Sequence, residues 1–147
     1  MSKGRFVYVT YITAAPEKVF DALISEEATR AYWWHVNASD WKKGSRWEHQ
    51  RQDPAKTVDI EGTVLEIDRP RRLVITWSRP SEGSSPDRVS RVTFEIERYN
   101  DATRLTVAHE DLDPEMEKSV AGGWPKVLAN LKSFLETGRT FQVWEPR

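Results

Sequence analysis

Residues 113–138 read DPEMEKSVAGGWPKVLANLKSFLETG, and the rest of the chain is interpreted around this segment. Its apolar residues recur at the 3.6-residue period of an amphipathic helix. They are Val120, Trp124, Val127, Leu128, Leu131, Phe134 and Leu135. Asp113 is a suitable N-cap before Pro114, and Gly138 stands where a left-handed C-terminal cap is expected. The segment predicts a long helix over residues 114–137, with a kink near residues 121–125 because Pro125 removes a backbone hydrogen bond.

The N-terminal part predicts a strand followed by two short helices. Residues 6–12 read FVYVTYI, a β-branched and aromatic run that is typical of a strand. Pro16 and Glu17 begin the first helix, because proline suits the first helical position and an acidic side chain suits the first turn. Ser25 caps a second short helix that extends to Tyr32 or Trp33. Residues 35–44 look irregular.

From residue 45 onward the sequence alternates as antiparallel strands do. The alternating segments are residues 45–50, 58–67, 73–77, 92–97 and 105–109. Apolar parity changes near Gly62–Leu65, which predicts a bulge or a sharp bend. Asn100-Asp101 marks a hairpin tip, and residues 79–87 form a polar loop. We therefore expect an α+β fold in which a curved antiparallel sheet wraps round the C-terminal helix, because a twisted sheet of this size curls.

Composition narrows the classes of function. The chain has 147 residues with 22 basic and 23 acidic side chains, so its net charge of -1 gives no general attraction to nucleic acid or anionic lipid. Without cysteine it can form neither disulfides nor thiolate zinc sites. No stretch approaches the roughly 18 apolar residues of a membrane span, and we expect a cytoplasmic protein. Seven tryptophans are unusual in so polar a chain, and such rings occur both in cores and in ligand pockets.

Local motifs add a resemblance that covers nearly the whole chain. They are APEKVFDAL at residues 15–23, Tyr32-Trp33, SDWKKGSRWE at 39–48, GTVLEI at 62–67, PRRL at 70–73 and Gly123-Trp124-Pro125. In this order they resemble the helix-grip superfamily of pollen-allergen-like and START-like lipid-binding domains, also called SRPBCC. More closely, they look like the family similar to the C-terminal domain of the activator of the heat-shock protein 90 ATPase. The resemblance implies a single helix-grip domain over residues 1–147.

The chaperone activators that the sequence resembles also carry an N-terminal domain that makes much of the contact with the chaperone. This sequence begins directly with the first predicted strand, so we expect no such domain here. The resemblance therefore implies the fold more strongly than it implies chaperone activation, because one scaffold hosts many functions.

Large side chains on the apolar parity of their elements are the candidate lining of a cavity between sheet and helix. The candidates are Trp33, Trp47, Trp77, Phe94, His109, Trp124 and Leu128. Each could instead fill the core, although so many large rings on one curved sheet are difficult to pack without gaps. Trp33 and Trp34 cannot both face the core, because neighbours on a helix are about 100° apart. One of them is expected at a pocket mouth or an interface.

The sequence contains no catalytic or cofactor motif. It lacks a nucleophile elbow, a phosphate loop and a dinucleotide fingerprint. His35 and His49 are not spaced with a carboxylate as metal ligands are. His109 could act as an acid or base, because an unperturbed histidine has a pKa near 6.5, or it could be a hydrogen-bonded core residue. We predict no catalytic residue, no cofactor and no metal.

The leading hypothesis is a module that binds a small hydrophobic ligand, lipid-like or aromatic, in the cavity. One alternative is an enzyme similar to the cyclases and aromatases on this scaffold, with His109 as acid or base. Another is a protein-interaction module that acts on a chaperone or another partner, and the chain could form a homodimer. Neither nucleic acid nor a membrane-spanning arrangement is expected.

Overall fold

The computed structural model describes residues 3–144, and in this part of the chain seven strands form one antiparallel sheet. In chain order the elements are β1 (Gly4–Ile12), α1 (Pro16–Ile24), α2 (Glu26–Tyr32), β2 (His35–Ser39), β3 (Arg46–Arg51), β4 (Val58–Asp68), β5 (Arg72–Trp77), the 3-10 turn η1 (Pro86–Arg88), β6 (Ser90–Tyr99), β7 (Ala102–Leu112) and α3 (Pro114–Thr137). This is the predicted α+β helix-grip arrangement, with two short helices after the first strand and a long helix at the end. None of these helices is long and apolar enough to cross a membrane.

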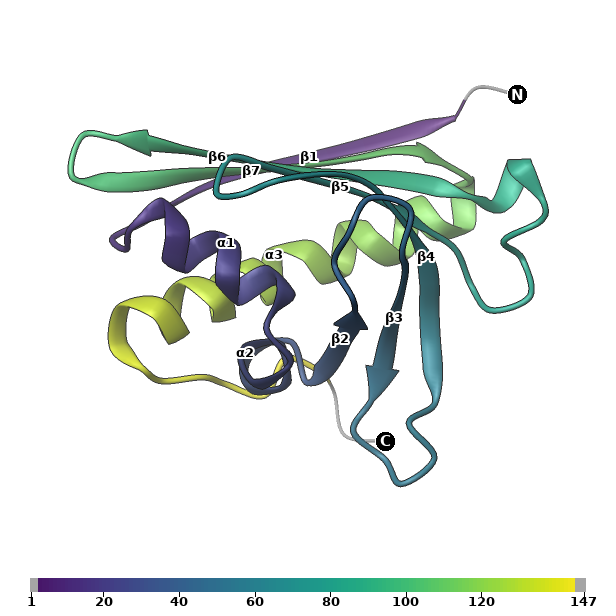
Figure 1. Ribbon diagram of the computed structural model, residues 1–147, viewed down its shortest axis with the longest axis horizontal. Helices are drawn as coiled ribbons and strands as arrows, with labels where there is room; N and C mark the ends of the chain where they lie inside the picture. The colour runs from purple at the N-terminus through teal and green to yellow at the C-terminus, as the bar shows by residue number, and fades with distance from the viewer. Residues whose placement is uncertain (1–2, 145–147) are drawn as a thin grey trace.

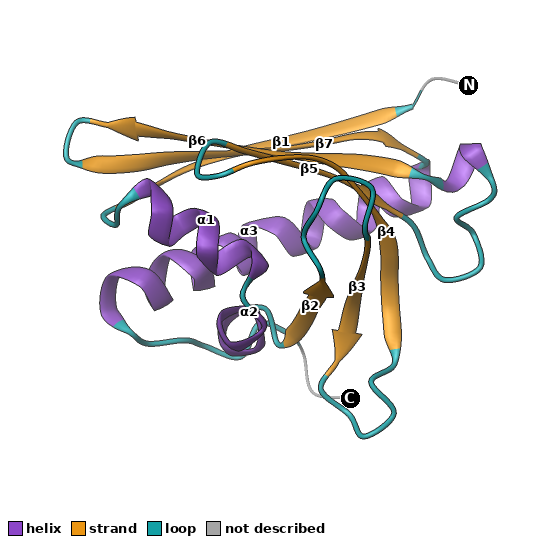
Figure 2. Ribbon diagram, viewed as in Figure 1, coloured by secondary structure: helices purple, strands orange, loops and turns teal. Residues whose placement is uncertain are grey.

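The sheet is curved around α3. Its strand order is β1-β7-β6-β5-β4-β3-β2, so the first strand pairs with the last and every neighbouring pair is antiparallel. In Figure 1, β1, β7, β6 and β5 lie above α3, whereas β4, β3 and β2 turn away and run down one side of the molecule. Figure 2 shows α1 and α2 at the opposite end from the loop that carries η1. The concave face is therefore bounded by sheet above, sheet at one side and α3 below.

The long helix has the bounds and both caps that the sequence predicts. The Asp113 side chain accepts a hydrogen bond from the backbone N–H of Met116, and Pro114 occupies the first turn. At the other end Gly138 has a φ of 77°, the left-handed conformation that glycine adopts without steric cost. The helix continues through Pro125 without interruption, and the kink stays a prediction.

Asn130 interrupts the apolar face of α3. It is fully buried, and its side-chain N–H groups donate to the carbonyl oxygens of Tyr32 and Phe141. Its carbonyl oxygen accepts from the backbone N–H of Phe141. These bonds satisfy the buried amide and tie both α2 and the C-terminal tail to the helix.

The prediction was wrong for residues 35–39, whereas the expectation that Trp33 and Trp34 cannot both face the core is confirmed. Residues 35–39 form the edge strand β2, which pairs with β3, although five residues reading HVNAS carry too little apolar alternation to indicate a strand. Trp33 is the C-cap of α2, and Trp34 has a φ of 62°, outside the helix. This turn buries Trp33 and leaves Trp34 exposed.

Gly62 allows β4 to bend between its two neighbours. A Cβ at this position would lie 2.1 Å from the backbone oxygen of Thr76 on β5, a separation that no real Cβ adopts. Just beyond it, the pairing of β4 with β5 shifts register between Val64 and Glu66, which places the predicted bulge at Leu65. Glycine and bulge together let the sheet turn from its flat upper part into the side wall.

We expect Gly62→Ala to destabilise the fold by about 1–3 kcal/mol, because the backbone of β5 must move to admit the methyl group. Gly122→Ala is the matched control. Nothing lies within 4 Å of a Cβ at Gly122, and alanine in a helix interior is favoured over glycine by about 0.5–1 kcal/mol. Urea unfolding of both variants measures the difference. Equal stability of the two would contradict the close approach at Gly62.

Candidate functional site

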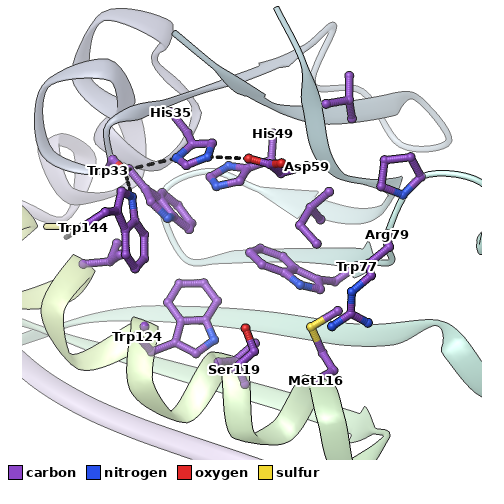
Figure 3. Close-up of a pocket in the computed structure, with 16 residues that line it drawn as sticks. Trp33, His35, His49, Asp59, Trp77, Arg79, Met116, Ser119, Trp124 and Trp144 are labelled. Carbon is purple, nitrogen blue, oxygen red and sulfur yellow. Dashed lines mark hydrogen bonds and ion pairs between the residues drawn. The ribbon is translucent and has the colours of Figure 1, made fainter. Parts of the chain in front are cut away.

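A cavity of about 440 Å³ lies between α3 and the side wall of the sheet. Its lining comes from the end of α2, from β2, β3, β4 and β5, from the loop after β5, from α3 and from the C-terminal tail (Figure 3). The lining residues are Trp33, His35, His49, Val58, Asp59, Ile60, Trp77, Arg79, Pro80, Met116, Ser119, Val120, Gly123, Trp124, Val127 and Trp144. Volume and composition are those of a small-molecule pocket, which is mostly apolar with a few placed polar groups.

Three tryptophans from three different elements surround the cavity. The ring centroids of Trp33 and Trp124 are 5.4 Å apart, those of Trp77 and Trp124 are 5.6 Å apart, and those of Trp33 and Trp77 are 6.4 Å apart. Tilted and offset arrangements at these distances are favourable for aromatic pairs. Trp144 adds a fourth ring, and its indole N–H donates to the backbone oxygen of Trp33 at 3.1 Å. The tail thus closes one side of the cavity.

A polar cluster from β2, β3 and β4 forms another wall. The rings of His35 and His49 stack with centroids 4.1 Å apart. His35 Nε2 lies 2.9 Å from a carboxylate oxygen of Asp59, and its Nδ1 contacts the backbone oxygen of Trp33 at 3.4 Å. The guanidinium of Arg51 bonds the same carboxylate at 2.9 Å. Both His35 nitrogens and both Asp59 oxygens are therefore already engaged within the protein.

These contacts set the charges of the wall. Partial burial raises the pKa of Asp59, but the hydrogen bonds from Arg51 and His35 outweigh it, so the pKa of this carboxyl lies below its usual value. Burial holds the pKa of His49 well below that of an ordinary histidine, and the neighbouring His35 lowers it further. His49 is therefore neutral near pH 7, and its Nδ1 contacts the side-chain oxygen of Asn37 at 2.6 Å.

A chain of buried hydrogen bonds lies behind Trp124. The indole N–H of Trp124 can only donate, so His109 Nδ1 accepts it at 3.1 Å. His109 Nε2 then carries the proton and donates to Ser90 Oγ at 2.8 Å, and the Ser90 hydroxyl donates to the backbone oxygen of Trp77 at 3.0 Å. Burial lowers the pKa of His109 to about 3, which keeps it neutral. The relay links α3 to β7, β6 and β5 and fixes the orientation of Trp124.

The structure brings three of the seven sequence-predicted site residues to the cavity, namely Trp33, Trp77 and Trp124. The other four lie in the core outside the lining. Trp47 is completely buried and donates its indole N–H to the backbone oxygen of Thr76. Phe94 packs edge-on against Trp124, and His109 is enclosed in the relay. Leu128 is buried on α3. All four lie on the buried face of their strand or helix, as the lining residues do. The face on which a residue lies therefore does not by itself distinguish the core from the cavity wall.

Sequence reasoning missed the polar wall, Arg79, Met116 and Trp144. His35 and His49 were considered only as metal ligands, and no group of three or more His, Asp or Glu side chains among residues 3–144 is placed to hold a metal ion. Met116 precedes the apolar stripe by one helical turn, a signal that could have extended the stripe toward the cavity. No local sequence pattern indicated that Asp59 or Trp144 would line the cavity.

A curved antiparallel sheet that grips a long C-terminal helix, with a cavity between the two, defines the helix-grip class of proteins. Within that class, the family model described as Activator of Hsp90 ATPase homolog 1-like protein matches residues 13–136. The chain belongs to this family. No curated protein shows significant similarity to it.

Solved structures share the fold at low sequence identity. The Aha1 dimer from Colwellia psychrerythraea superimposes with a TM-score of 0.75 at 17% identity, covering 92% of this chain and 98% of that one. CalU16 from Micromonospora echinospora superimposes with a TM-score of 0.74 at 20% identity, covering 92% of this chain and 76% of that one. An HSP90 activator from Plasmodium falciparum superimposes with a TM-score of 0.72 at 20% identity, covering 89% of this chain and 95% of that one. At these identities the likeness concerns the fold.

The relay predicts a specific dependence of stability on pH. Because the folded protein lowers the pKa of His109 from 6.5 to about 3, the unfolded chain binds more protons between these values. The free energy of unfolding therefore falls as the pH is lowered below 6.5, by at most about 1.4 kcal/mol per pH unit for this group. Replacing His109→Gln removes the titration, and urea unfolding at pH 7 and pH 5 should show a smaller loss than in the wild type. An equal loss in both proteins would exclude this role for His109.

Proposed function

We propose that this protein binds a small, largely apolar molecule with aromatic character in the cavity between α3 and the side wall of the sheet. The observation that carries the proposal is a space of about 440 Å³ that four tryptophans from separate elements leave unfilled. Rigid aromatic walls lose little conformational entropy on binding and offer a large contact area. Burial of apolar ligand surface would supply the affinity, at roughly 25 cal/mol per Å² before ordering costs are subtracted.

The polar groups of the cavity favour binding over catalysis. Enzyme sites hold an acid or base near neutral pKa within reach of the substrate. Here His35 and Asp59 are engaged with each other, and neutral His49 is a weak base because its pKa is depressed. His109, the acid or base that the enzyme alternative requires, lies in the core with both nitrogens bonded to protein groups.

A bulky side chain at the cavity wall should abolish binding. Ser119 is an exposed lining residue on α3, so Ser119→Trp places a ring in the cavity without disturbing the core. Lys118→Trp is the matched control, because Lys118 is also exposed on the helix but does not line the cavity. We expect flavone and 2-acetylnaphthalene to bind wild type and Lys118→Trp with one molecule per chain in native mass spectrometry, and to bind Ser119→Trp at least about tenfold more weakly.

Binding that survives in Ser119→Trp would place the ligand elsewhere on the protein. If neither these aromatic probes nor laurate binds the wild type at all, the cavity is not a site for small apolar molecules.

A second candidate function is a protein-interaction module, and one surface feature favours it. Val7, Val9 and Tyr11 alternate along one face of β1 and are each more than 40% exposed, as is Tyr99, whose ring lies 5.2 Å from that of Tyr11. An apolar row on an edge strand is a typical contact site for another protein. The family description and the two similar structures described as an Aha1 dimer and as an HSP90 activator support a partner of this kind.

We expect Val9→Lys to weaken such an association, because a lysine in an apolar contact must lose its hydration. Sedimentation equilibrium of wild type and Val9→Lys reports a homodimer, and the ATPase rate of purified Hsp90 with each protein reports a chaperone contact. Val9→Thr, which keeps the strand but adds no charge, is the control. A monomeric wild type that leaves the ATPase rate unchanged would argue against this second function.

A further inference from the structure

The indole N–H of Trp77 is a buried donor without an acceptor. Among residues 3–144, Trp77 Nε1 and Glu82 Oε2 are the two buried side-chain polar atoms that have no hydrogen-bond partner. The indole groups of Trp47, Trp124 and Trp144 all donate to protein acceptors. Leaving a buried donor unpaired lowers stability, and buried polar groups in native proteins are nearly always paired. The exception at Trp77 occurs on the wall of the cavity, so a bound molecule could supply the missing acceptor.

The groups around this nitrogen are also hydrogen-bond donors. Figure 3 shows the nitrogen of Trp77 on the edge of the ring that faces α3, on the side of Met116 and Ser119, with the Arg79 guanidinium nearby. Ser119 lines the same space, and its hydroxyl can also donate a hydrogen bond. An indole N–H and a guanidinium cannot accept hydrogen bonds. This end of the cavity therefore fits a ligand atom that accepts.

The charge at this end favours a neutral acceptor over a carboxylate. Arg79 is the only lysine or arginine among the lining residues, and it already lies 3.3 Å from a carboxylate oxygen of Glu115 and 3.9 Å from one of Glu82. Asp59, the other charged residue of the lining, is paired with Arg51 and His35. An anionic ligand would compete with two glutamates for a single guanidinium and would lose its hydration on entry. A carbonyl oxygen accepts from Trp77 without that cost.

We propose that the molecule bound here is a neutral aromatic carbonyl compound, such as an aryl ketone, a flavone or a quinone, whose oxygen accepts the hydrogen bond of Trp77 Nε1. This inference rests on the proposed binding function and specifies its ligand. The aromatic part lies among Trp33, Trp77 and Trp124. Met116 lies beside the nitrogen edge of Trp77 in Figure 3, and its flexible, unbranched side chain shifts to admit the oxygen.

Three 2-substituted naphthalenes of similar size test the proposal by isothermal titration calorimetry. They are 2-acetylnaphthalene, which carries the carbonyl group, 2-ethylnaphthalene, which lacks it, and 2-naphthoate, which replaces it with a carboxylate. We expect 2-acetylnaphthalene to bind about tenfold more tightly than 2-ethylnaphthalene, because the ethyl group leaves the indole unpaired. 2-Naphthoate should bind more weakly than the ketone.

Removal of the donor should abolish this preference. Trp77→Phe keeps an aromatic ring but no N–H, so the two neutral probes should bind it with affinities equal within about twofold. Trp34→Phe, which alters an exposed tryptophan outside the cavity, should keep the tenfold preference. The indole ¹H–¹⁵N signal of Trp77 in the wild type gives a second readout that does not depend on the variant folding. It should move downfield with 2-acetylnaphthalene and not with 2-ethylnaphthalene.

The outcomes separate this inference from the function on which it rests. Equal affinity of the wild type for the ketone and the hydrocarbon, or tighter binding of 2-naphthoate, overturns the carbonyl proposal and leaves binding of small apolar molecules intact. An unchanged Trp77 indole signal on binding of the ketone also overturns it. If none of the three probes binds, the proposed binding function itself fails.

Discussion

The indole N–H of Trp124 donates to a buried, neutral histidine, and this contact determines how the long helix sits against the sheet. His109 can accept it only because its other nitrogen donates to Ser90, which in turn donates to the backbone of β5. Three strands and the helix are thus held in one register by polar groups that have no access to water. Breaking any link would leave a buried group unpaired, which costs more than a single such bond contributes. The relay fixes the orientation of the Trp124 ring, which packs against Trp33 and forms part of the cavity wall.

The general architecture could be predicted from residue patterns, but the division between core and cavity could not. Helix α3 follows from its apolar period and its caps at Asp113 and Gly138, which are local signals. The edge strand β2 could not be recognised, because its residues do not alternate between apolar and polar, and its first three residues are all buried. Trp47 on β3 and Trp77 on β5 both lie on the apolar parity of their strands, yet Trp47 is enclosed in the core and Trp77 lines the cavity. That distinction depends on the curvature that Gly62 permits, which is a property of three strands together.

The cavity and the exposed row on β1 lie on different parts of the molecule, and each depends on different structural features. The cavity needs rigid rings and paired polar groups, and its walls come from elements that the relay and Asn130 hold in place. The row of Val7, Val9 and Tyr11 needs only a regular strand with one face toward solvent. A protein of this fold can therefore change its partner surface without changing its cavity. Membership of a family described by chaperone activation is compatible with a small-molecule site on the same scaffold.

The pairing of β1 with β7 also constrains the order of events during synthesis. Tyr8 lies opposite Val107 and Ile12 opposite Thr103, so the first strand must wait for a partner made about a hundred residues later. Until then its apolar edge is open, and the closing of such a long loop slows folding relative to proteins with local contacts. Until β7 has been made, β1 lacks its partner strand, and an unpaired apolar strand edge is where an incomplete chain can associate with another.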